Sequence, residues 1–419
     1  MYKKKIPALQ QDKAYDDAAI TVFDANEDGH PDIYIASGGY YNLSASDSLL
    51  RDRLYLNDGK NNFIKSKGLP DIRGSKSCVK IEDINSDGYA DIFVGGRVVP
   101  GRYPETPKSY ILINDSKGNF SDQTGKICPE LSKLGMVTDA AWIDLDLDHK
   151  DELVIVGEWM PVTVFRQGNG KLVNSTNQYF DKAYSGWWNT IAVGDFNSDH
   201  RPDLIIGNTG LNTQFKASEK EPLEMYYKDF DNNGSVDPIF SFYIQHKRYP
   251  YITRDELVGQ LPFLRKRFSN FKSYADITME DLFQNNELND ANHLVAGHMN
   301  TTLFLSTQTG KFNLAELPQE VQYSPVYTID TLDFNGDGNT DLLLCGNNSR
   351  TKIRLGKFDA NYGVLLAGNG KGNFDYVKQN QTGFNIWGDV RSCVQIRDKI
   401  YFGINGKNLI AYTLSKQKK

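Results

Sequence analysis

Residues 333–341 read Asp333-Phe-Asn335-Gly-Asp337-Gly338-Asn-Thr-Asp341, and an apolar run, Leu342 to Cys345, follows at once. Oxygen-bearing side chains occupy positions 1, 3, 5 and 9 of this stretch, and position 7 offers its backbone carbonyl. This alternation suits a hard cation such as Ca²⁺, which takes about six to eight oxygen ligands at roughly 2.3–2.6 Å. Gly338 at position 6 allows the positive φ that lets the oxygens converge. The stretch is therefore a candidate calcium loop.

The same spacing occurs six times along the chain. Four copies have glycine at position 6, and two have His149 or His200 there, a residue type that tolerates left-handed backbone better than most. An ordinary Asp/Asn/Gly turn would account for one copy, but not for six that all place an acid at position 9. The sequence therefore predicts up to six Ca²⁺ sites. The candidate ligands are Asp24, Asn26, Asp28, His30, Asp32; Asp83, Asn85, Asp87, Tyr89, Asp91; Asp144, Asp146, Asp148, Lys150, Glu152; Asp195, Asn197, Asp199, Arg201, Asp203; Asp229, Asp231, Asn233, Ser235, Asp237; and Asp333, Asn335, Asp337, Asn339, Asp341.

Length and composition limit the classes of protein to which the chain can belong. The 419 residues are 39% hydrophobic and 12% aromatic with 36 glycines, which suits a β-rich globular chain with many turns. No apolar run approaches the roughly 18 residues of a membrane span, and no signal peptide is expected in this chain. The net charge is −6, and the basic ends Lys3–Lys5 and Lys416–Lys419 are expected to aid solubility rather than to bind nucleic acid, which is not an expected partner. The four cysteines lack metal-site spacing and are expected to be free thiols, mostly buried.

Repeated short strands predict the architecture. Each acidic loop is flanked by apolar runs of β type rather than by the helices of an EF-hand, so the loop joins two antiparallel strands. The second strand ends at glycine again and again, and a third and a fourth run follow, joined by Gly/Asn turns that favour tight hairpins. Such four-stranded units repeat about seven times. The expected fold is an all-β, seven-bladed β-propeller of four-stranded antiparallel blades, with a short helical insertion near residues 249–288.

The spacing of the loops sets the expected boundaries. Residues 1–419 are predicted to form a single β-propeller domain. The N-terminal segment Lys5–Gln10 is expected to add a fourth strand to the last blade and close the ring. The loop Asp229–Asp237 is expected in the hairpin between the third and fourth strands of the fourth blade. The predicted blades cover approximately residues 14–70, 76–125, 136–180, 187–248, 289–318, 324–380 and 388–415.

Several stretches bring a family resemblance. The chain resembles the FG-GAP or VCBS-repeat family, calcium-loop propellers that also form the head of integrin α subunits, and it is most similar to bacterial propellers that accompany ASPIC/UnbV domains. The resemblance implies a seven-bladed propeller with Ca²⁺ in its loops, in an exported or cell-surface protein used for binding or assembly. The chain departs from that pattern because it has no ASPIC/UnbV segment. The stretches that carry the resemblance are Phe93–Pro104, Gly186–Asn189, Gly194–Phe196 and Gly207–Asn212.

The expected function is non-catalytic binding of a protein or a carbohydrate. In a propeller, the turns opposite the calcium loops share one face, where aromatic, Arg and Asn side chains would contact a ligand. An enzyme acting in the central channel, such as a polysaccharide hydrolase or lyase, is an alternative that Glu158, His298 and Arg391 would serve only by position. A scaffold of an envelope complex is a second alternative, and other domains of a longer parent chain are an alternative kind of partner. The candidate ligand-face residues are Arg97, Tyr103, Trp159, Trp187, Trp188, Asn208, Asn212, Asn347, Trp387 and Arg391.

Overall fold

The computed structural model describes residues 6–414, except residue 61 and residues 284–286. The described residues form seven antiparallel sheets, so the prediction of an all-β chain with seven antiparallel sheets is confirmed. The chain divides into two compact units. Unit 1 comprises residues 1–142, 166–173 and 219–295, and unit 2 comprises residues 143–165, 174–218 and 296–419. A single propeller domain over the whole chain stays a prediction.

Five of the sheets are built from strands that follow one another in sequence. Three of them have four strands in the order of the chain. They are β1 (Asp17–Phe23), β2 (Asp32–Ser37), β3 (Arg53–Asn57) and β4 (Phe63–Lys65); β5 (Ser75–Glu82), β6 (Asp91–Val98), β7 (Tyr110–Asn114) and β8 (Phe120–Asp122); and β22 (Val326–Leu332), β23 (Asp341–Gly346), β24 (Val364–Gly368) and β25 (Phe374–Val377). A five-stranded sheet contains β9 (Met136–Ile143), β10 (Glu152–Pro161), β11 (Thr163–Gly168), β12 (Lys171–Asn174) and β13 (Ser185–Trp187). A three-stranded sheet contains β26 (Val390–Ile396), β27 (Lys399–Ile404) and β28 (Ile410–Thr413).

The two remaining sheets are nested in sequence. One has the order β14-β15-β20-β21 and encloses the other, which has the order β18-β17-β16-β19. The predicted blades 187–248 and 289–318 are therefore wrong, because Ile205 pairs with Leu303 across the whole inserted sheet. The enclosing strands are β14 (Thr190–Gly194), β15 (Asp203–Gly207), β20 (Thr302–Ser306) and β21 (Phe312–Ala315). The inserted strands are β16 (Leu223–Lys228), β17 (Asp237–Ile244), β18 (Lys247–Pro250) and β19 (Asn292–Ala296).

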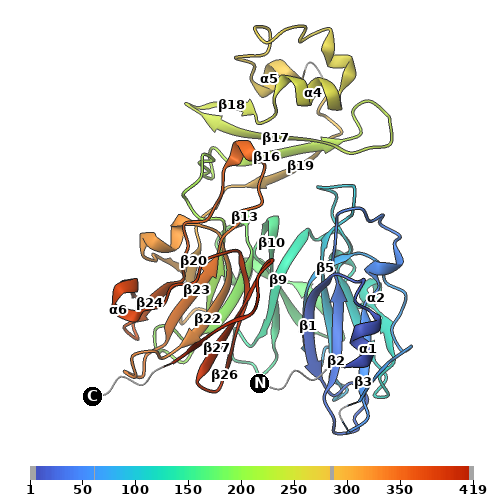
Figure 1. Cartoon of the computed structure of the whole chain (residues 1–419), viewed down its shortest axis with the longest axis vertical. Helices are drawn as coiled ribbons and strands as arrows, with labels where there is room; N and C mark the ends of the chain where they lie inside the picture. The colour runs from blue at the N-terminus through green and yellow to red at the C-terminus, as the bar shows by residue number, and fades with distance from the viewer. Residues whose placement is uncertain (1–5, 61, 284–286, 415–419) are drawn as a thin grey trace. The chain divides into compact units, whose positions relative to one another are not determined.

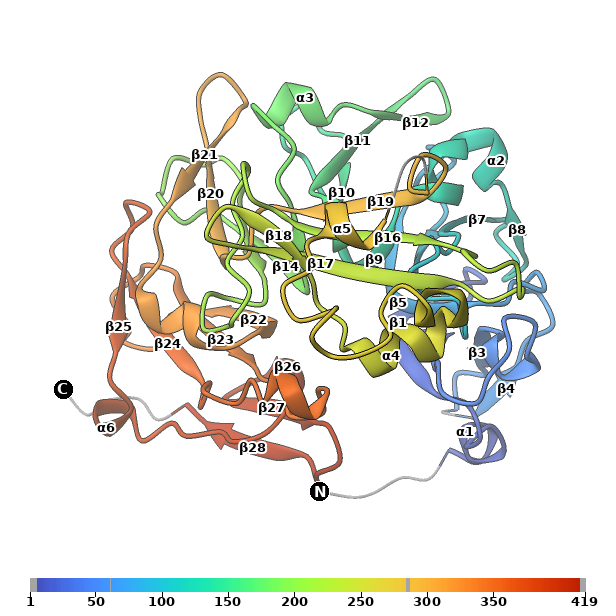
Figure 2. The ribbon, with the colours of Figure 1, turned by 90° about the horizontal axis from the view of Figure 1, so that it is seen from above.

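Helices cover one face of the inserted sheet (Figures 1 and 2). They are α4 (Arg254–Gln260), the 3₁₀ turn η3 (Pro262–Arg265) and α5 (Met279–Leu282). Thr253 and Glu256 form a capping box at the start of α4, which satisfies backbone N–H groups that lack partners in the first turn. Ile239 of β17 lies in one apolar cluster with Leu257 and Met279. The predicted helical insertion near residues 249–288 is confirmed.

The expected N-terminal closing strand is wrong for the residues that the structure describes. Pro7–Gln11 form a short helix, α1, with Pro7 at its first position, where the missing N–H and fixed φ of proline are tolerated. Lys5 lies outside the described residues. None of the described helices is long and apolar enough to cross a membrane. The other helices are α2 (Thr124–Ile127), α3 (Thr176–Tyr179), α6 (Gln379–Thr382), and the 3₁₀ turns η1 (Ser48–Leu50), η2 (Pro129–Lys133), η4 (Gln319–Tyr323) and η5 (Ile353–Leu355).

Neighbouring sheets bury their faces against each other within each unit. In unit 1, Tyr34 and Leu54 of the first sheet share a buried cluster with Ile92 and Leu112 of the second. In unit 2, one buried cluster joins β15, β20, β23 and β24, and another joins β23, β24 and β27. Stacking of this kind is expected of repeats that cannot bury both faces alone. The four cysteines are free, and all but Cys393 are buried; burial raises the pKa of Cys78 to about 12.

Candidate metal loops and ligand face

Each predicted loop follows the first strand of its sheet, and its last acid begins the next strand. The loop Asp229–Asp237 joins β16 and β17, the first two strands of the inserted sheet, so its expected place in a third-to-fourth hairpin is wrong. The acids at position 9 are Asp32, Asp91, Glu152, Asp203, Asp237 and Asp341, and they begin β2, β6, β10, β15, β17 and β23.

The position-1 carboxylate accepts the same two backbone hydrogen bonds in every loop, and these bonds stabilise a common loop conformation. In the first loop, Asp24 accepts hydrogen bonds from the backbone N–H groups of Asp28 (3.2 Å) and Gly29 (2.7 Å). Equivalent pairs of bonds reach Asp83, Asp144, Asp195, Asp229 and Asp333. Position 6 has positive φ in all six loops, and this includes His149 (67°) and His200 (63°). Both histidine copies therefore adopt the loop conformation that the sequence predicts.

Position 4 also has a left-handed backbone, which the sequence did not reveal. Glu27, Ser86, Leu147, Ser198 and Asn232 all have φ near 60°, and Gly336 has φ 75°. Left-handed backbone costs most side chains roughly 1 kcal/mol or more. The residue types at position 4 share no property, so only the recurrence of the loop could have indicated this conformation. Two such residues per loop turn the backbone sharply, and in two of the loops the oxygens of positions 1, 3 and 9 lie close together.

The position-9 carboxylate ties the loop to the third strand. Asp203 is 0% exposed. One of its oxygens accepts from the Phe196 N–H within the loop (2.9 Å), and the other accepts from the Ser306 N–H at the end of β20 (2.7 Å). Asp32, Asp91 and Asp341 make the equivalent pairs of bonds in their sheets. These acids therefore have a structural role whatever cation binds, although a carboxylate keeps further lone pairs for a metal.

The donor set inside the loops fits a hard divalent cation. Asn26 Oδ1 and Asp231 Oδ1, both at position 3, are buried and accept no hydrogen bond in the described structure. In the two loops with Asp at position 3, three carboxylate oxygens lie within 4.8 Å of one another. Those groups are Asp144, Asp146 and Glu152, and Asp229, Asp231 and Asp237. Converging oxygens without thiol or imidazole ligands are typical of Ca²⁺ rather than of zinc.

The electrostatics of the loops favour a bound cation. The pKa of Asp91 and of Asp203 is raised to about 6, mainly by burial and in part by the neighbouring position-5 aspartates, Asp87 and Asp199. Burial likewise raises the pKa of Asp32, Asp237 and Asp341. A desolvated carboxylate beside other carboxylates is costly to ionise. A divalent cation would offset that cost directly.

Positions 5 and 7 of each loop are joined by a hydrogen bond, and their role as metal ligands stays a prediction. The position-7 N–H donates to the position-5 side chain in every loop, for example from His30 to Asp28 (2.9 Å). Its own carbonyl is the atom expected to bind the metal. The other position-7 residues are Tyr89, Lys150, Arg201, Ser235 and Asn339, and they bond to Asp87, Asp148, Asp199, Asn233 and Asp337.

Three residues expected on the ligand face are buried instead. Trp188, Asn208 and Asn347 are all 0% exposed. Trp188 stacks on His298 and donates its Nε1–H to the Tyr184 carbonyl. The two asparagine amides bond backbone carbonyls, as Asn208 does to His298 (2.9 Å). The sequence does not distinguish an apolar or amide side chain that contacts a ligand from one that packs in the core, because both occur beside strand ends. These three residues pack in the core.

The other expected ligand-face residues of unit 2 differ in exposure. Trp159 is nearly buried and packs edge-on against Trp187, with ring centroids 5.1 Å apart. Trp387 is 56% exposed, and Lys407 Nζ lies 4.0 Å from its ring centroid. Asn212 is exposed and donates to the Tyr323 carbonyl. The Arg391 guanidinium lies over the Tyr327 ring and donates to the Asn347 carbonyl.

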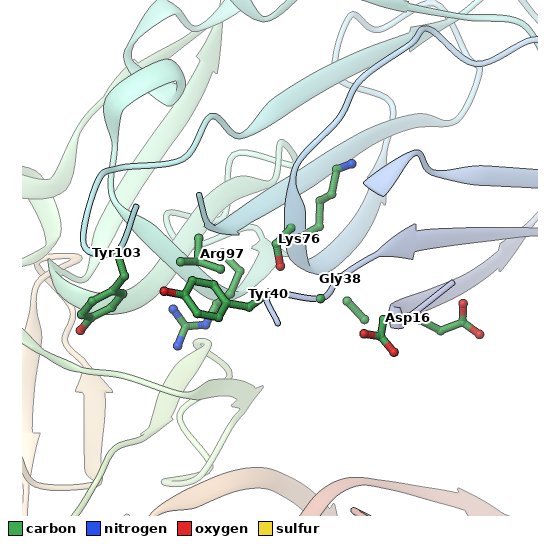
Figure 3. Close-up of a pocket in the computed structure, with 11 residues that line it drawn as sticks. Asp16, Gly38, Tyr40, Lys76, Arg97 and Tyr103 are labelled. Carbon is green, nitrogen blue, oxygen red and sulfur yellow. The ribbon is translucent and has the colours of Figure 1, made fainter. Parts of the chain in front are cut away.

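The remaining two expected residues, Arg97 and Tyr103, line one pocket in unit 1 (Figure 3). The pocket has a volume of about 680 Å³. It lies where β1 and β5 begin and β2 and β6 end, so it is at the opposite end of these strands from the calcium loops. Tyr40, three residues beyond the end of β2, also lines it. Its other lining residues are Asp16, Asp17, Ala18, Gly38, Gly39, Ser75, Lys76 and Val98.

A match to a family model agrees with the repeat pattern over residues 24–206. The family model for the FG-GAP-like repeat matches three overlapping segments, residues 24–94, 83–155 and 144–206. No curated protein sequence matches the chain. Among solved structures, the V. cholerae biofilm matrix protein Bap1 is similar at 10% identity and a TM-score of 0.33, over 96% of this chain and 88% of that one. BBS1N in its complex with ARL6DN is similar at 10% identity and a TM-score of 0.34, over 96% and 94%.

Proposed function

We propose that this chain, which matches the FG-GAP-like repeat over residues 24–206, is a non-catalytic interaction module whose six acidic loops bind Ca²⁺. Calcium stabilises the sheets, and the opposite ends of the strands present the ligand-binding surface. The partner is a protein or a carbohydrate. An exported or cell-surface location goes with this role, since extracellular calcium is abundant enough to fill weak loop sites.

The observation that carries the calcium proposal is the state of the position-3 oxygens. Asn26 Oδ1 and Asp231 Oδ1 are buried without a hydrogen bond, and an unsatisfied buried oxygen costs about 1–3 kcal/mol. In the loop of the inserted sheet, the Asp229, Asp231 and Asp237 oxygens also converge. Such an arrangement is unfavourable for the protein alone and becomes favourable around a cation.

The energetic effect of one loop is modest, and that of six is large. A cation that binds only the folded chain stabilises it by about 1.4 kcal/mol per site when its concentration is tenfold above Kd. Each loop also joins two strands whose register the position-9 acid fixes. Calcium bound in the loops would therefore hold adjacent strands in register as well as neutralise their carboxylates.

The interaction surface follows from the position of the loops. Calcium loops occupy one end of the strands, so a ligand that leaves them undisturbed would bind at the other end. In unit 1 this end carries Arg97 and Tyr103, which line the pocket of Figure 3. In unit 2 the exposed Trp387 is a separate aromatic contact. Exposed aromatic and arginine side chains are the types that dominate binding surfaces.

Bound metal can be counted directly. The protein is dialysed against a calcium buffer and its calcium content is measured by elemental analysis, with six ions per chain as the full complement. The double substitution Asp229→Asn with Asp231→Asn should remove one ion. Asp58→Asn, in a hairpin turn where Asp58 bonds Lys60 and Asn62, is the matched control and should remove none. A wild-type chain that retains no calcium would contradict the proposal.

A further inference from the structure

The last sheet has fewer strands than the others. It contains only β26, β27 and β28, whereas each of the other six sheets has at least four strands in the described structure. β28 is therefore an edge strand, and among the described residues it pairs only with β27 (Figure 2). Pro7–Gln11, most of the segment expected to supply the missing strand, forms α1 instead. No described residue of the chain supplies a fourth strand to this sheet.

Elsewhere in the chain, the fourth strand of a sheet packs an aromatic ring against the preceding sheet. Phe120 begins β8 and lies edge-on to Phe23, the last residue of β1, with ring centroids 6.2 Å apart. Phe374 begins β25 and lies edge-on to Phe196, at position 2 of the loop before β15, with ring centroids 6.0 Å apart. Each of these contacts lies within one compact unit. The fourth strands that begin with phenylalanine are β4 (Phe63), β8 (Phe120), β21 (Phe312) and β25 (Phe374).

The hairpin before the fourth strand also donates a hydrogen bond to the loop of the preceding sheet. The acceptor in both cases is the backbone carbonyl at position 2 of that loop. Asn114 Nδ2, at the end of β7, donates to the Ala25 carbonyl (3.0 Å). The Gly372 N–H, just before β25, donates to the Phe196 carbonyl (2.9 Å). One ring contact and one hydrogen bond therefore attach each of these hairpins to the preceding sheet.

The loop that precedes the last sheet lacks both attachments. Phe334 is at position 2 of this loop, and within the described structure its carbonyl accepts no hydrogen bond and no ring stacks on its side chain. Instead, a pocket of about 500 Å³ lies beside it, entirely within unit 2. Leu332 and Phe334 line this pocket at the positions that Phe23 and Phe196 hold in their own sheets. The other walls come from β23, β24, β25, α6, β27 and β28.

We propose that a β-strand of a different protein completes the last sheet. The strand pairs with β28 and places an aromatic side chain in this pocket, against Leu332 and Phe334. Hydrogen bonds along a sheet edge provide affinity in such complexes, and a pocket for an alternate side chain provides specificity. The inference rests on the proposed role as an interaction module. It does not depend on the ligand surface at the other end of the strands or on bound calcium.

The lining of the pocket and the pairing of the chain's own strands identify the kind of partner. The pocket is lined mainly by apolar side chains and by no Asp, Glu, Lys or Arg, so the inserted side chain is apolar. A small molecule would leave the edge of β28 unpaired. A second copy of this chain has no spare strand of the required kind among its described residues, because all four strands that begin with phenylalanine are paired in their own sheets. The occupant is therefore an extended segment of another protein.

The probe is a fluorescein-labelled peptide that copies a fourth strand of this chain, Lys371-Gly-Asn-Phe374-Asp-Tyr-Val-Lys378. Its binding to the full chain in calcium buffer is measured by fluorescence polarisation, and the peptide should bind. Phe374→Ala in the peptide should weaken binding by about tenfold or more, the effect of one lost aromatic contact. A methyl group on the Gly372 nitrogen of the peptide removes the donor to the Phe334 carbonyl and should weaken binding by about fivefold.

Two substitutions in the protein test the pocket itself. Phe334→Ala and Leu414→Ala each remove an apolar wall and should weaken peptide binding by about tenfold. Leu414 lies outside the calcium loops, so its effect does not depend on metal binding. Ile353→Ala is the matched control, because Ile353 is also in unit 2 but is 100% exposed and does not line the pocket. Circular dichroism checks that each variant is folded.

Three outcomes would overturn the inference. The first is no binding of the peptide. The second is binding that the substitutions in the pocket weaken no more than Ile353→Ala does. The third is a dimer of the protein, seen by analytical ultracentrifugation, that the peptide dissociates, because a second copy would then supply the strand. The calcium content of the same sample separates this result from the proposed function. A chain that holds calcium but binds no peptide contradicts only the inference, whereas a chain that binds the peptide without calcium contradicts only the metal proposal.

Discussion

Two aspartates of the loop 195–203 have different structural roles, because one is exposed and the other is buried. Asp199, at position 5, is exposed and bonds only groups of its own loop, Arg201 and Asn197. Asp203, at position 9, is buried and bonds backbone groups of the loop and of β20. Asp199 therefore bonds nothing outside its loop and can serve a cation there. Asp203 also connects the loop to β20.

Substitution separates these two roles. Asp203→Ala should destabilise the protein by about 2 kcal/mol or more in calcium and in EDTA alike, because it leaves two buried N–H groups without an acceptor. Asp199→Ala should destabilise the calcium-bound protein only. Urea unfolding in both buffers measures the difference. An effect of Asp203→Ala that disappears in EDTA would show that the acid acts only through the metal.

Glu224, a buried acid in β16 of the inserted sheet, makes the stability of the protein depend on pH. Burial alone would raise the pKa of Glu224, but hydrogen bonds from His293 (2.9 Å) and Arg248 (2.9 Å) lower it below its ordinary value. A lowered native pKa means that Glu224 contributes stability above its unfolded pKa of about 4.3. That contribution is lost as the pH falls through the native pKa.

Glu224→Gln should therefore cost about 2 kcal/mol near pH 7, the value of a charged hydrogen bond, and much less below about pH 4. Chemical unfolding at several pH values tests this. Glu316→Gln is the control, since no cation pairs with Glu316 in the described chain, and it should change little at any pH. A cost of Glu224→Gln that stays constant from neutral to acid pH would exclude the ion-pair explanation.

At the scale of elements, the glycines that end the second strands allow close packing between sheets. A Cβ on Gly207 would lie 2.7 Å from the Val326 carbonyl of the neighbouring sheet and 2.8 Å from Thr190 Cγ2. Within its own sheet, a Cβ on Gly346 would lie 1.7 Å from the carbonyl of Pro325, which precedes the paired strand β22. The repeated glycine that helped to predict the blades is therefore a packing requirement. It is not only a turn signal.

Gly207→Ala should destabilise the protein by about 2–3 kcal/mol, because the neighbouring backbone cannot move far enough to admit a methyl group. Gly168→Ala provides the control. Gly168 also ends a strand, but a Cβ there would contact nothing within 4 Å. Thermal unfolding of the two variants should differ clearly, and equal stability would refute the packing argument.

Local patterns in the sequence predicted local structure. The six loops, the helical insertion and the positive φ at His149 and His200 follow from residues within a few positions of one another, and the structure has all of these features. The pairing of β15 with β20 spans the inserted sheet, and no local signal reports such a contact. The helix at Pro7–Gln11 was missed because a short apolar segment reads equally as strand or helix.

The sequence predicted the position of the loop residues better than it predicted which residues lie on the ligand face. Loop ligands are defined by spacing, so their places were predictable. Ligand-face residues are defined by exposure, which spacing does not give. Trp188 and Asn347 are fully buried, whereas Arg97 and Tyr103 do line a pocket.

For the whole molecule, the central claim is that calcium in six loops stabilises the fold. Six bound Ca²⁺ would change the formal net charge from −6 to +6. At tenfold excess over Kd, six sites would together contribute about 8 kcal/mol. Both units carry three loops each, one of them in the inserted sheet of unit 1. Every part of the chain that holds a loop should therefore respond to calcium.

The most direct test is thermal unfolding in EDTA, in calcium and in magnesium, with circular dichroism as the measured signal. Saturating calcium should raise the Tm by roughly 10 °C over EDTA. Magnesium should raise it much less, because it prefers a smaller octahedral shell and gives up its water reluctantly. The same Tm in EDTA and in calcium would contradict the account and leave the six loops as turns without a metal.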